Sequence, residues 1–204
     1  MSDFVPLREE DADPDPVRQF AAWFRAAREA GVSAPEAAAV ATASPEGVPS
    51  ARMVLVKHYD ERGLVFFTSY ESRKAGELAA NPRAALLFYW APLGRQVRIE
   101  GRVERASPEE SAAYVRTRAR ASQLSALASP QSRPIASRAA LEARVSELAA
   151  LHAGADLPLP EVWGGFRLRP DSFEFWQNRE DRLHDRLRYT RAADGRWEVE
   201  RLAP

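Results

Sequence analysis

The stretch AALLFYWAPLGRQVRIEGRVE, residues 84–104, decides the fold class of this chain. Residues 84–90 form an apolar run of the length of a buried strand, far short of the about 20 residues that a membrane span needs. Residues 96–104 alternate between apolar and polar side chains, as a strand with one buried face does. The two segments are separated by a short turn, which is the spacing of an antiparallel hairpin.

Further strand-like segments lie on both sides of this pair, and turn signals separate them. They are residues 37–44, 51–59, 64–68, 165–168, 172–177, 183–190 and 196–202. Helical spacing or helix caps predict helices over residues 15–31, 72–80, 107–118 and 136–151. Because strands and helices do not alternate regularly, a doubly wound sheet is disfavoured. We predict an α+β protein whose antiparallel sheet closes into a barrel, with the helices peripheral.

Composition sets the remaining limits. Residues 1–14 are acidic and aperiodic and are predicted to be a flexible tail, which leaves residues 15–204 as a single domain. The start of the sequence lacks the apolar core of a signal peptide, so we expect a cytoplasmic location. The net charge is +0, which argues against a nucleic-acid or membrane partner. With no cysteine and three scattered histidines, no metal site is expected.

Cations accompanied by hydroxyl or amide donors recur in the chain and indicate anion binding. The clusters are residues 52–57 on a strand, residues 72–74 at a helix start, Tyr114 with Arg118 and Ser122, and Arg182 with His184 and Arg186. The spacing i, i+4, i+8 places the third cluster on one face if a single helix runs that far. The spacing i, i+2, i+4 places the fourth on one face of a strand. Each cluster alone is also explained by surface charge, but together they favour one or two phosphorylated ligands.

Several longer motifs carry a family resemblance. They are RMVLVKHYD (52–60), FFTSYESRKAGEL (66–78), RQVRIEGRVER (95–105), WGGFRLRP (163–170), FEFWQ (173–177), RLHDRLRY (182–189) and RLAP (201–204). In their order and their gaps they resemble pyridoxamine 5′-phosphate oxidase, also called pyridoxine 5′-phosphate oxidase, from about residue 15 onward. The resemblance implies an FMN-binding split β-barrel and a homodimer with two FMN sites at the subunit interface.

The implied reaction oxidises pyridoxamine 5′-phosphate or pyridoxine 5′-phosphate to pyridoxal 5′-phosphate. Hydride would pass from the substrate C4′ to flavin N5, and O2 would then reoxidise the flavin and give H2O2. The flavin supplies this chemistry, and the protein supplies position and electrostatics.

The resemblance also assigns residues by motif position. The implied FMN contacts are Arg52, Met53, Val54, Leu55, Val56, Lys57, Phe67, Thr68, Arg73, Lys74, Gln96, Gln131, Ser132, Trp176 and Arg186. Among them Arg52, Arg73, Lys74 and Ser132 suit the FMN phosphate, and Gln96 suits the isoalloxazine edge. The implied substrate contacts are Lys57, Tyr114, Arg118 and Ser122 for the phosphate, and Arg182, Leu183 and His184 beside the pyridine ring. Arg182 and His184 are the expected catalytic residues, with orientation of C4′ as their role.

The chain departs from the family pattern at three places. The segment FVPLREE (4–10) replaces a basic and aromatic stretch, which puts a substrate lid in doubt. Phe67 stands where tyrosine is frequent, and residues 178–181 replace a more glycine-rich stretch. In addition, Arg52 and Lys57 have opposite parity on a regular strand, so they reach a single phosphate only if the strand contains a bulge.

Two other functions remain open. Another split-barrel FMN-dependent reductase would share the barrel but lack the substrate set of Tyr114, Arg118, Ser122 and the RLHDR motif. A non-catalytic FMN- or pyridoxal-phosphate-binding protein would bind its ligand without turnover.

Overall fold

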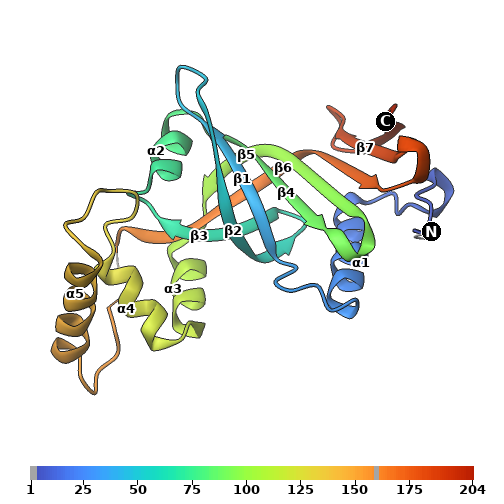
Figure 1. Cartoon of the computed structure of the whole chain (residues 1–204). Coiled ribbons are helices and arrows are strands. Elements are labelled where there is room, and N and C mark those ends of the chain that lie inside the picture. Colours follow the sequence, from blue (N-terminus) through green and yellow to red (C-terminus); the bar gives the residue numbers. More distant parts are fainter. Residues whose placement is uncertain (1–3, 159–160) are drawn as a thin grey trace.

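The computed structural model describes residues 4–158 and 161–204, whose eight strands form one sheet of antiparallel neighbours. The strands are β1 (Ala37–Ala43), β2 (Pro49–Asp60), β3 (Gly63–Ser69), β4 (Arg83–Trp90), β5 (Arg95–Arg105), β6 (Trp163–Gln177), β7 (Asp185–Arg191) and β8 (Trp197–Arg201). Their order is β3-β2-β1-β4-β5-β6-β7-β8, and an additional β3–β6 pairing closes the first six into a barrel. Strands β7 and β8 extend from that barrel (Figure 1). The predicted α+β class with a closed antiparallel barrel is therefore confirmed.

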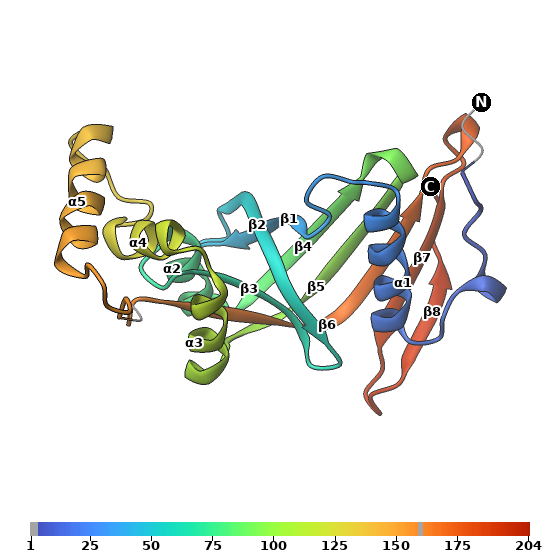
Figure 2. The same cartoon turned by 90° about the horizontal axis from the view of Figure 1, so that it is seen from below.

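Five helices accompany the barrel in the described part of the chain. They are α1 (Pro16–Glu29), α2 (Arg73–Ala80), α3 (Pro108–Thr117), α4 (Arg120–Ala128) and α5 (Arg138–Leu151). Figure 2 shows α3, α4 and α5 at one end of the molecule, with both termini, β7 and β8 at the other. No helix of the described residues has the length and apolarity needed to cross a membrane.

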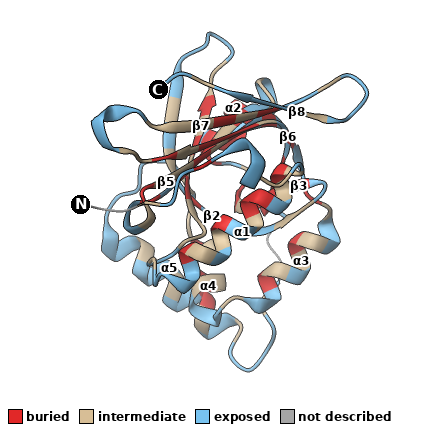
Figure 3. Cartoon of the chain, turned by 90° about the vertical axis from the view of Figure 1, so that its right-hand side faces the viewer, coloured by how far each residue is buried: buried red, intermediate tan, exposed pale blue. Residues whose placement is uncertain are grey.

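Helix α1 packs its apolar stripe against the barrel. It starts as predicted, because the Asp15 carboxylate accepts a hydrogen bond from the Val17 amide at 2.9 Å and Pro16 occupies the first turn. The Phe20 ring lies 5.1 Å from the rings of Tyr59 and Phe88, and it is almost fully buried. Figure 3 shows the buried positions of α1 together with those of the strands. This shared core fixes the position of α1 on the barrel.

Strand β6 corrects the sequence-based assignment of two strands at 165–168 and 172–177. The structure joins them into one strand of 15 residues that runs through Pro170. A register shift between Glu100 and Gly101 leaves Asp171 as an extra residue opposite β5. Because a bulge relaxes the ladder at this point, the missing N–H of proline does not interrupt the strand.

The sequence predicts a flexible tail over residues 1–14, of which residues 1–3 lie outside the described part of the chain. From residue 4 onward it instead packs on β7 and β8. The Leu7 side chain is 5% exposed, and the Tyr189 hydroxyl donates to the Asp13 carbonyl at 2.8 Å. A single buried leucine within an acidic, aperiodic stretch gives no periodic signal, so only the tertiary structure reveals this contact.

A buried arginine joins the barrel to α3. The Arg167 side chain on β6 is 4% exposed and donates to Asp60 at 2.8 Å and to Glu110 at 2.6 Å. The Arg62 side chain, which is 63% exposed, bonds the same two carboxylates at 2.9 Å each. Asp60 and Glu110 therefore each pair with one buried arginine, Arg167, and one exposed arginine, Arg62.

We predict that Arg167→Met lowers the free energy of unfolding by about 2–4 kcal/mol, because Asp60 and Glu110 then lose their buried counter-charge. Arg62→Met, the matched control, should cost less than about 1 kcal/mol because its pair is screened by water. Urea unfolding at one protein concentration measures both losses. Equal losses of unfolding free energy in the two variants would contradict the larger contribution expected of the buried Arg167.

Candidate functional site

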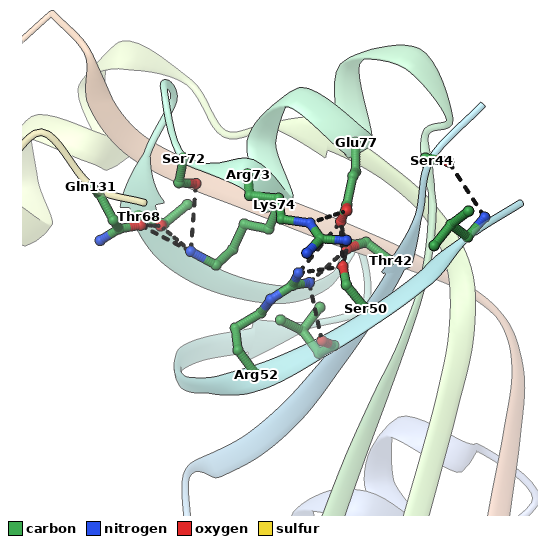
Figure 4. Close-up of polar contacts among 12 residues, drawn as sticks. Thr42, Ser44, Ser50, Arg52, Thr68, Ser72, Arg73, Lys74, Glu77 and Gln131 are labelled. Atoms are coloured by element: carbon green, nitrogen blue, oxygen red, sulfur yellow. Dashed lines mark hydrogen bonds and ion pairs between the residues drawn. The ribbon is translucent and has the colours of Figure 1, made fainter. Parts of the chain in front are cut away.

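A cluster of cations lies where β2 faces the start of α2, and we call Arg52, Arg73, Lys74 and Glu77 the cation cluster. Figure 4 shows Arg52 and Arg73 converging on Glu77, whereas Lys74 extends toward Thr68. The Glu77 carboxylate accepts from Arg73 at 2.8 Å and from Arg52 at 3.4 Å. Helix α2 begins at Arg73, so the partial positive charge of its N-terminus adds to the cluster.

Lys74 is a buried cation whose hydrogen-bond partners are neutral. Its ammonium donates to Thr68 Oγ1 and to Gln131 Oε1, both at 2.9 Å, and more weakly to Ser72 Oγ at 3.4 Å. None of the ion pairs among the described residues includes it. Burial, and secondarily the charge of Arg52, lower the pKa of Lys74 to about 8. A buried ammonium next to a second cation favours an anionic ligand.

Glu77 holds the two arginines of the cluster. Burial alone would raise its pKa, but hydrogen bonds from Ser50, Thr42 and Arg73 outweigh burial and lower the pKa to about 2. The carboxylate is therefore ionised at neutral pH and orients both guanidinium groups. Sequence reasoning missed Glu77, although its i, i+4 spacing from Arg73 on a helix is a signal that could have found it.

A second group of side chains lies at α3. We call Phe67, Tyr114, Trp163 and Arg118 the aromatic stack. The Tyr114 ring lies 3.9 Å from the Phe67 ring, and the nearly parallel Trp163 ring lies 5.8 Å from Phe67 and 6.1 Å from Tyr114. The Arg118 guanidinium lies 4.8 Å from the centre of the Trp163 ring. Among the described residues, its Nη1 is the buried side-chain atom without a hydrogen-bond partner. Such an orphaned donor indicates a ligand or water at this point.

The predicted single helical face of Tyr114, Arg118 and Ser122 is wrong. Helix α3 ends at Thr117, and Arg118 has extended backbone angles of φ −77° and ψ 146°. Helix α4 restarts at Arg120, so Ser122 lies in the first turn of a different helix. The Thr117 hydroxyl donates to the Tyr114 carbonyl at 2.7 Å, which supplies a local alternative to continued helix.

The predicted shared strand face of Arg182, His184 and Arg186 is also wrong. Strand β7 begins at Asp185, and Arg182 lies in the preceding turn with φ +60°. His184 is 4.6 Å from the Trp176 ring, and Leu183 is 69% exposed. Arg186 is on the strand, where it donates to Glu174 at 3.0 Å and to the Ala203 carbonyl at 2.7 Å.

Strand register brings three other predicted cofactor residues into one row. Gln96 on β5 is opposite Trp176 on β6, and Trp176 is opposite Arg186 on β7. Directly paired residues of neighbouring strands share a face of the sheet, so these side chains are neighbours.

The remaining predicted residues are distributed over β2 and the loop after α4. Val54 and Val56 are buried in the core, whereas Met53 and Leu55 point outward and are 64% and 45% exposed. Lys57 pairs with Glu36 at 3.0 Å and has no contact with the rings of the aromatic stack among the described residues. The β2–β3 register shifts between Val56 and His58, so the strand contains a bulge and Lys57 is its extra residue. Ser132, next to Gln131, is exposed with φ +70°.

The comparisons with known proteins agree with one another. The family model "Pyridoxamine 5′-phosphate oxidase" matches residues 24–152, and "Pyridoxine 5′-phosphate oxidase C-terminal dimerisation region" matches residues 163–204. A pyridoxine/pyridoxamine 5′-phosphate oxidase of Rubrobacter xylanophilus is 56% identical over 97% of this chain and 91% of its own length. One from Janthinobacterium is 54% identical over 97% and 93%.

Solved structures show the same likeness. PhzG from Burkholderia lata 383, in complex with tetrahydrophenazine-1-carboxylic acid, has a TM-score of 0.92, 35% identity and 98% coverage of both chains. A pyridoxamine 5′-phosphate oxidase-related, FMN-binding protein of Nostoc punctiforme has a TM-score of 0.74 at 20% identity and shares the fold, covering 94% of this chain and 100% of its own.

The closed barrel with its two added strands defines a protein of the FMN-binding split-barrel class. Within that class, the chain belongs to the pyridoxamine 5′-phosphate oxidase family.

The depressed pKa of Lys74 gives a prediction for stability. Its charge destabilises the ligand-free fold fully below pH about 8, and the cost fades as pH rises toward the ordinary lysine value of 10.5. Lys74→Met should therefore raise the Tm of the ligand-free protein at pH 7 by about 2–4 °C, the shift that about 1 kcal/mol gives in a domain of this size. The gain should shrink at pH 10.

The control is Lys57→Met, which removes the only other lysine of the chain, an exposed residue paired with Glu36. Its Tm should stay within about 2 °C of wild type. Thermal unfolding of both variants at pH 7 and pH 10 measures the effect, and a lower Tm for Lys74→Met at pH 7 would contradict the prediction.

Proposed function

We propose that this protein is an FMN-dependent oxidase that converts pyridoxamine 5′-phosphate or pyridoxine 5′-phosphate to pyridoxal 5′-phosphate. The observation that carries the proposal is the buried Lys74 ammonium, which lacks a carboxylate partner in a chain more than half identical to oxidases of that name. A phosphate monoester is the ligand that this charge distribution favours.

The cation cluster fits the FMN phosphate. Arg52, Arg73 and Lys74 are the cations, and Gln131 and Ser132 complete the donor set from the loop after α4. Thr68 and Phe67 lie beside it on β3, and the row of Gln96, Trp176 and Arg186 offers one amide, one ring and one cation to the isoalloxazine. The FMN, when bound, would take up the hydride at N5 and be reoxidised by O2 with release of H2O2.

The aromatic stack fits the substrate phosphate. Arg118 Nη1 needs an acceptor, and a phosphate oxygen at this point would satisfy it. The Tyr114 and Ser122 hydroxyls would add donors from α3 and α4. Lys57 would join them only after its ion pair with Glu36 opens.

Arg182 and His184 would position the pyridine ring. Their role is to hold C4′ at the hydride acceptor, which makes the transfer nearly unimolecular. Leu183, which is exposed between them, would cover the ring on one side.

One chain cannot supply both halves of the substrate site. Arg118, proposed for the substrate phosphate, lies on Trp163 at the start of β6. His184, proposed for the pyridine ring, lies beside Trp176 near the end of the same strand. These tryptophans are separated by roughly 40 Å along the strand at about 3.3 Å per residue, and Figure 2 shows the α3 end and β7 at opposite ends of the molecule. A molecule of one ring and one phosphate does not span that separation, so the proposed site requires a second copy.

An apolar face on the barrel offers the surface for that second copy. Met53 on β2 and Leu87 on β4 both pair with Ala39 on β1, and Tyr89 follows on the same face. Met53, Leu87 and Tyr89 are 64%, 37% and 61% exposed. A contiguous exposed apolar patch indicates a protein interface, and the matched dimerisation region is consistent with a homodimer.

Aerobic release of H2O2 from pyridoxine 5′-phosphate with added FMN tests the activity. We expect peroxide and pyridoxal 5′-phosphate in equal amounts, dependent on FMN. Binding of FMN without turnover would favour a carrier, and turnover only with a reduced nicotinamide would favour a reductase. Binding of tetrahydrophenazine-1-carboxylic acid in place of the phosphorylated substrates would favour a ligand class like that of PhzG.

Arg118→Ala should raise KM for pyridoxine 5′-phosphate at least about tenfold, because a charge-assisted bond is worth about 1.5–3 kcal/mol and 1.4 kcal/mol is a factor of ten. FMN affinity should be unchanged. Arg116→Ala is the control, since Arg116 is a nearby arginine on α3 that is exposed. Steady-state kinetics measure both, and a wild-type KM in Arg118→Ala would remove the aromatic stack from the substrate site.

Leu87→Glu should shift the protein from dimer to monomer in sedimentation at micromolar concentration and weaken FMN binding, because it places a charge in the apolar face. Leu151→Glu on α5, where Leu151 is 75% exposed, should remain a dimer. A Leu87→Glu monomer that still binds FMN as tightly as wild type would contradict a site shared between chains.

A further inference from the structure

The loop that carries Arg182 and His184 is strained. Asp181 and Arg182 are consecutive non-glycine residues with φ of +54° and +60°. Side chains with a Cβ disfavour this left-handed region, so such a loop persists only where the surrounding structure holds it. The contacts made by residues 178–185 therefore determine where the two proposed ring-binding residues lie.

One contact of the loop selects the tautomer of the neutral His184 ring. The backbone N–H of Arg179 donates to His184 Nδ1 at 3.1 Å. A ring nitrogen that accepts a hydrogen bond carries no proton, so the neutral ring carries its proton on Nε2. His184 can then only donate from Nε2, which is the property needed to bond an oxygen or nitrogen of a substrate ring.

The side chain of Arg179 ties this loop to the start of the chain. Its Nη1 donates to the Phe4 carbonyl at 2.6 Å, and its Nε lies 3.7 Å from Asp185 Oδ2. The Phe4 ring packs against the turn at Gly94, where an added Cβ would lie 2.7 Å from the ring and 2.9 Å from Asn178 Cβ. Phe4 and Asn178, the first residue of the loop, thus both lie against the β4–β5 turn.

The next residues of the N-terminal segment hold the other end of the loop. The Leu7 amide donates to Asp185 Oδ2 at 3.1 Å. Arg201 on β8 bonds Glu9 through two oxygens, at 2.6 and 2.7 Å, and bonds Asp185 Oδ1 at 2.8 Å. The hydrogen bond from Arg201 lowers the pKa of Glu9 to about 2, so this pair is ionised at neutral pH.

We propose that residues 4–9 act as a brace: through Arg179, Asp185 and Arg201 they hold the strained loop so that His184 keeps its proton on Nε2 and presents it as a donor. Arg179 and Glu9 are then positioning residues for the oxidation, a role that rests on the proposed function. They act through His184 and touch neither cofactor nor substrate.

The tautomer of His184 can be observed directly in the ligand-free protein. Nitrogen-15 NMR of histidine-labelled protein distinguishes protonated from unprotonated ring nitrogens, and His184→Asn identifies the signals among the three histidines. We expect wild-type His184 to show one tautomer, protonated at Nε2. Arg179→Ala and Glu9→Gln should each give a mixture of tautomers, and Arg179→Lys, which keeps a donor for the Phe4 carbonyl, should restore the single form.

Glu10→Gln is the matched control. Glu10 neighbours Glu9, but its ion pair is with the exposed Arg8 at 3.5 Å. This variant should leave both the tautomer and the kinetics unchanged.

Kinetics provide the second readout. Glu9→Gln and Arg179→Ala should lower kcat/KM at least about fivefold with FMN affinity within about twofold of wild type, whereas a stabilising contact alone would lower Tm and leave kcat/KM unchanged well below the Tm. A single unchanged tautomer and unchanged kcat/KM in both variants would overturn the brace. Failure of wild type to oxidise either substrate would overturn the proposed function instead. The tautomer measurement needs no substrate, so it tests the brace independently of the proposed function.

Discussion

Barrel closure by strand β6 is the constraint on which the rest of the structure depends. The first half of β6 pairs with β3, and its second half pairs with β7. Gly164 and Gly165 let neighbouring side chains pack closely on this strand, because a Cβ at these positions would lie 2.2 Å from the Tyr70 hydroxyl and 2.7 Å from Ala106 Cβ. The same strand carries Trp163 at one end and Trp176 at the other. The element that closes the barrel therefore also places both halves of the proposed site.

The cation cluster shows how stability and binding oppose each other in this fold. Glu77 compensates Arg52 and Arg73 and is itself stabilised by them. Lys74 has no such compensation, and its lowered pKa reflects the cost of burying the charge. Function commonly requires such locally unfavourable arrangements, because a group already satisfied by the protein has little to gain from a ligand. An anion at Lys74 would remove the cost and bind more tightly for that reason.

Local signals predicted most of the fold. The capping box at the start of α3 is present as expected, with Ser107 Oγ accepting from the Glu110 amide at 3.1 Å and Glu110 accepting from the Ser107 amide at 3.2 Å. Strand alternation and turn residues likewise gave the hairpins, since these depend on neighbours in sequence. The cation cluster was anticipated in part, because Arg73 and Lys74 follow a helix cap.

The errors occur where an irregular backbone or a distant segment decides the conformation and the periodic pattern does not. The turn at Arg182 has a left-handed backbone that no alternation pattern reveals, and Leu7 is buried only because β7 and β8 meet it. The break after α3 gives Arg118 an extended backbone, and its guanidinium lies on Trp163, which comes 45 residues later in the chain. The proposed site residues lie at these irregular points, and we infer that regular elements supply a rigid frame while departures from regularity orient individual side chains. In this protein β6 is the frame, and the strained loop beside the N-terminal brace acts at only one of its ends. A disturbance of the brace therefore reaches the ring-binding half of the proposed site and leaves the phosphate-binding half, at the other end of β6, in place.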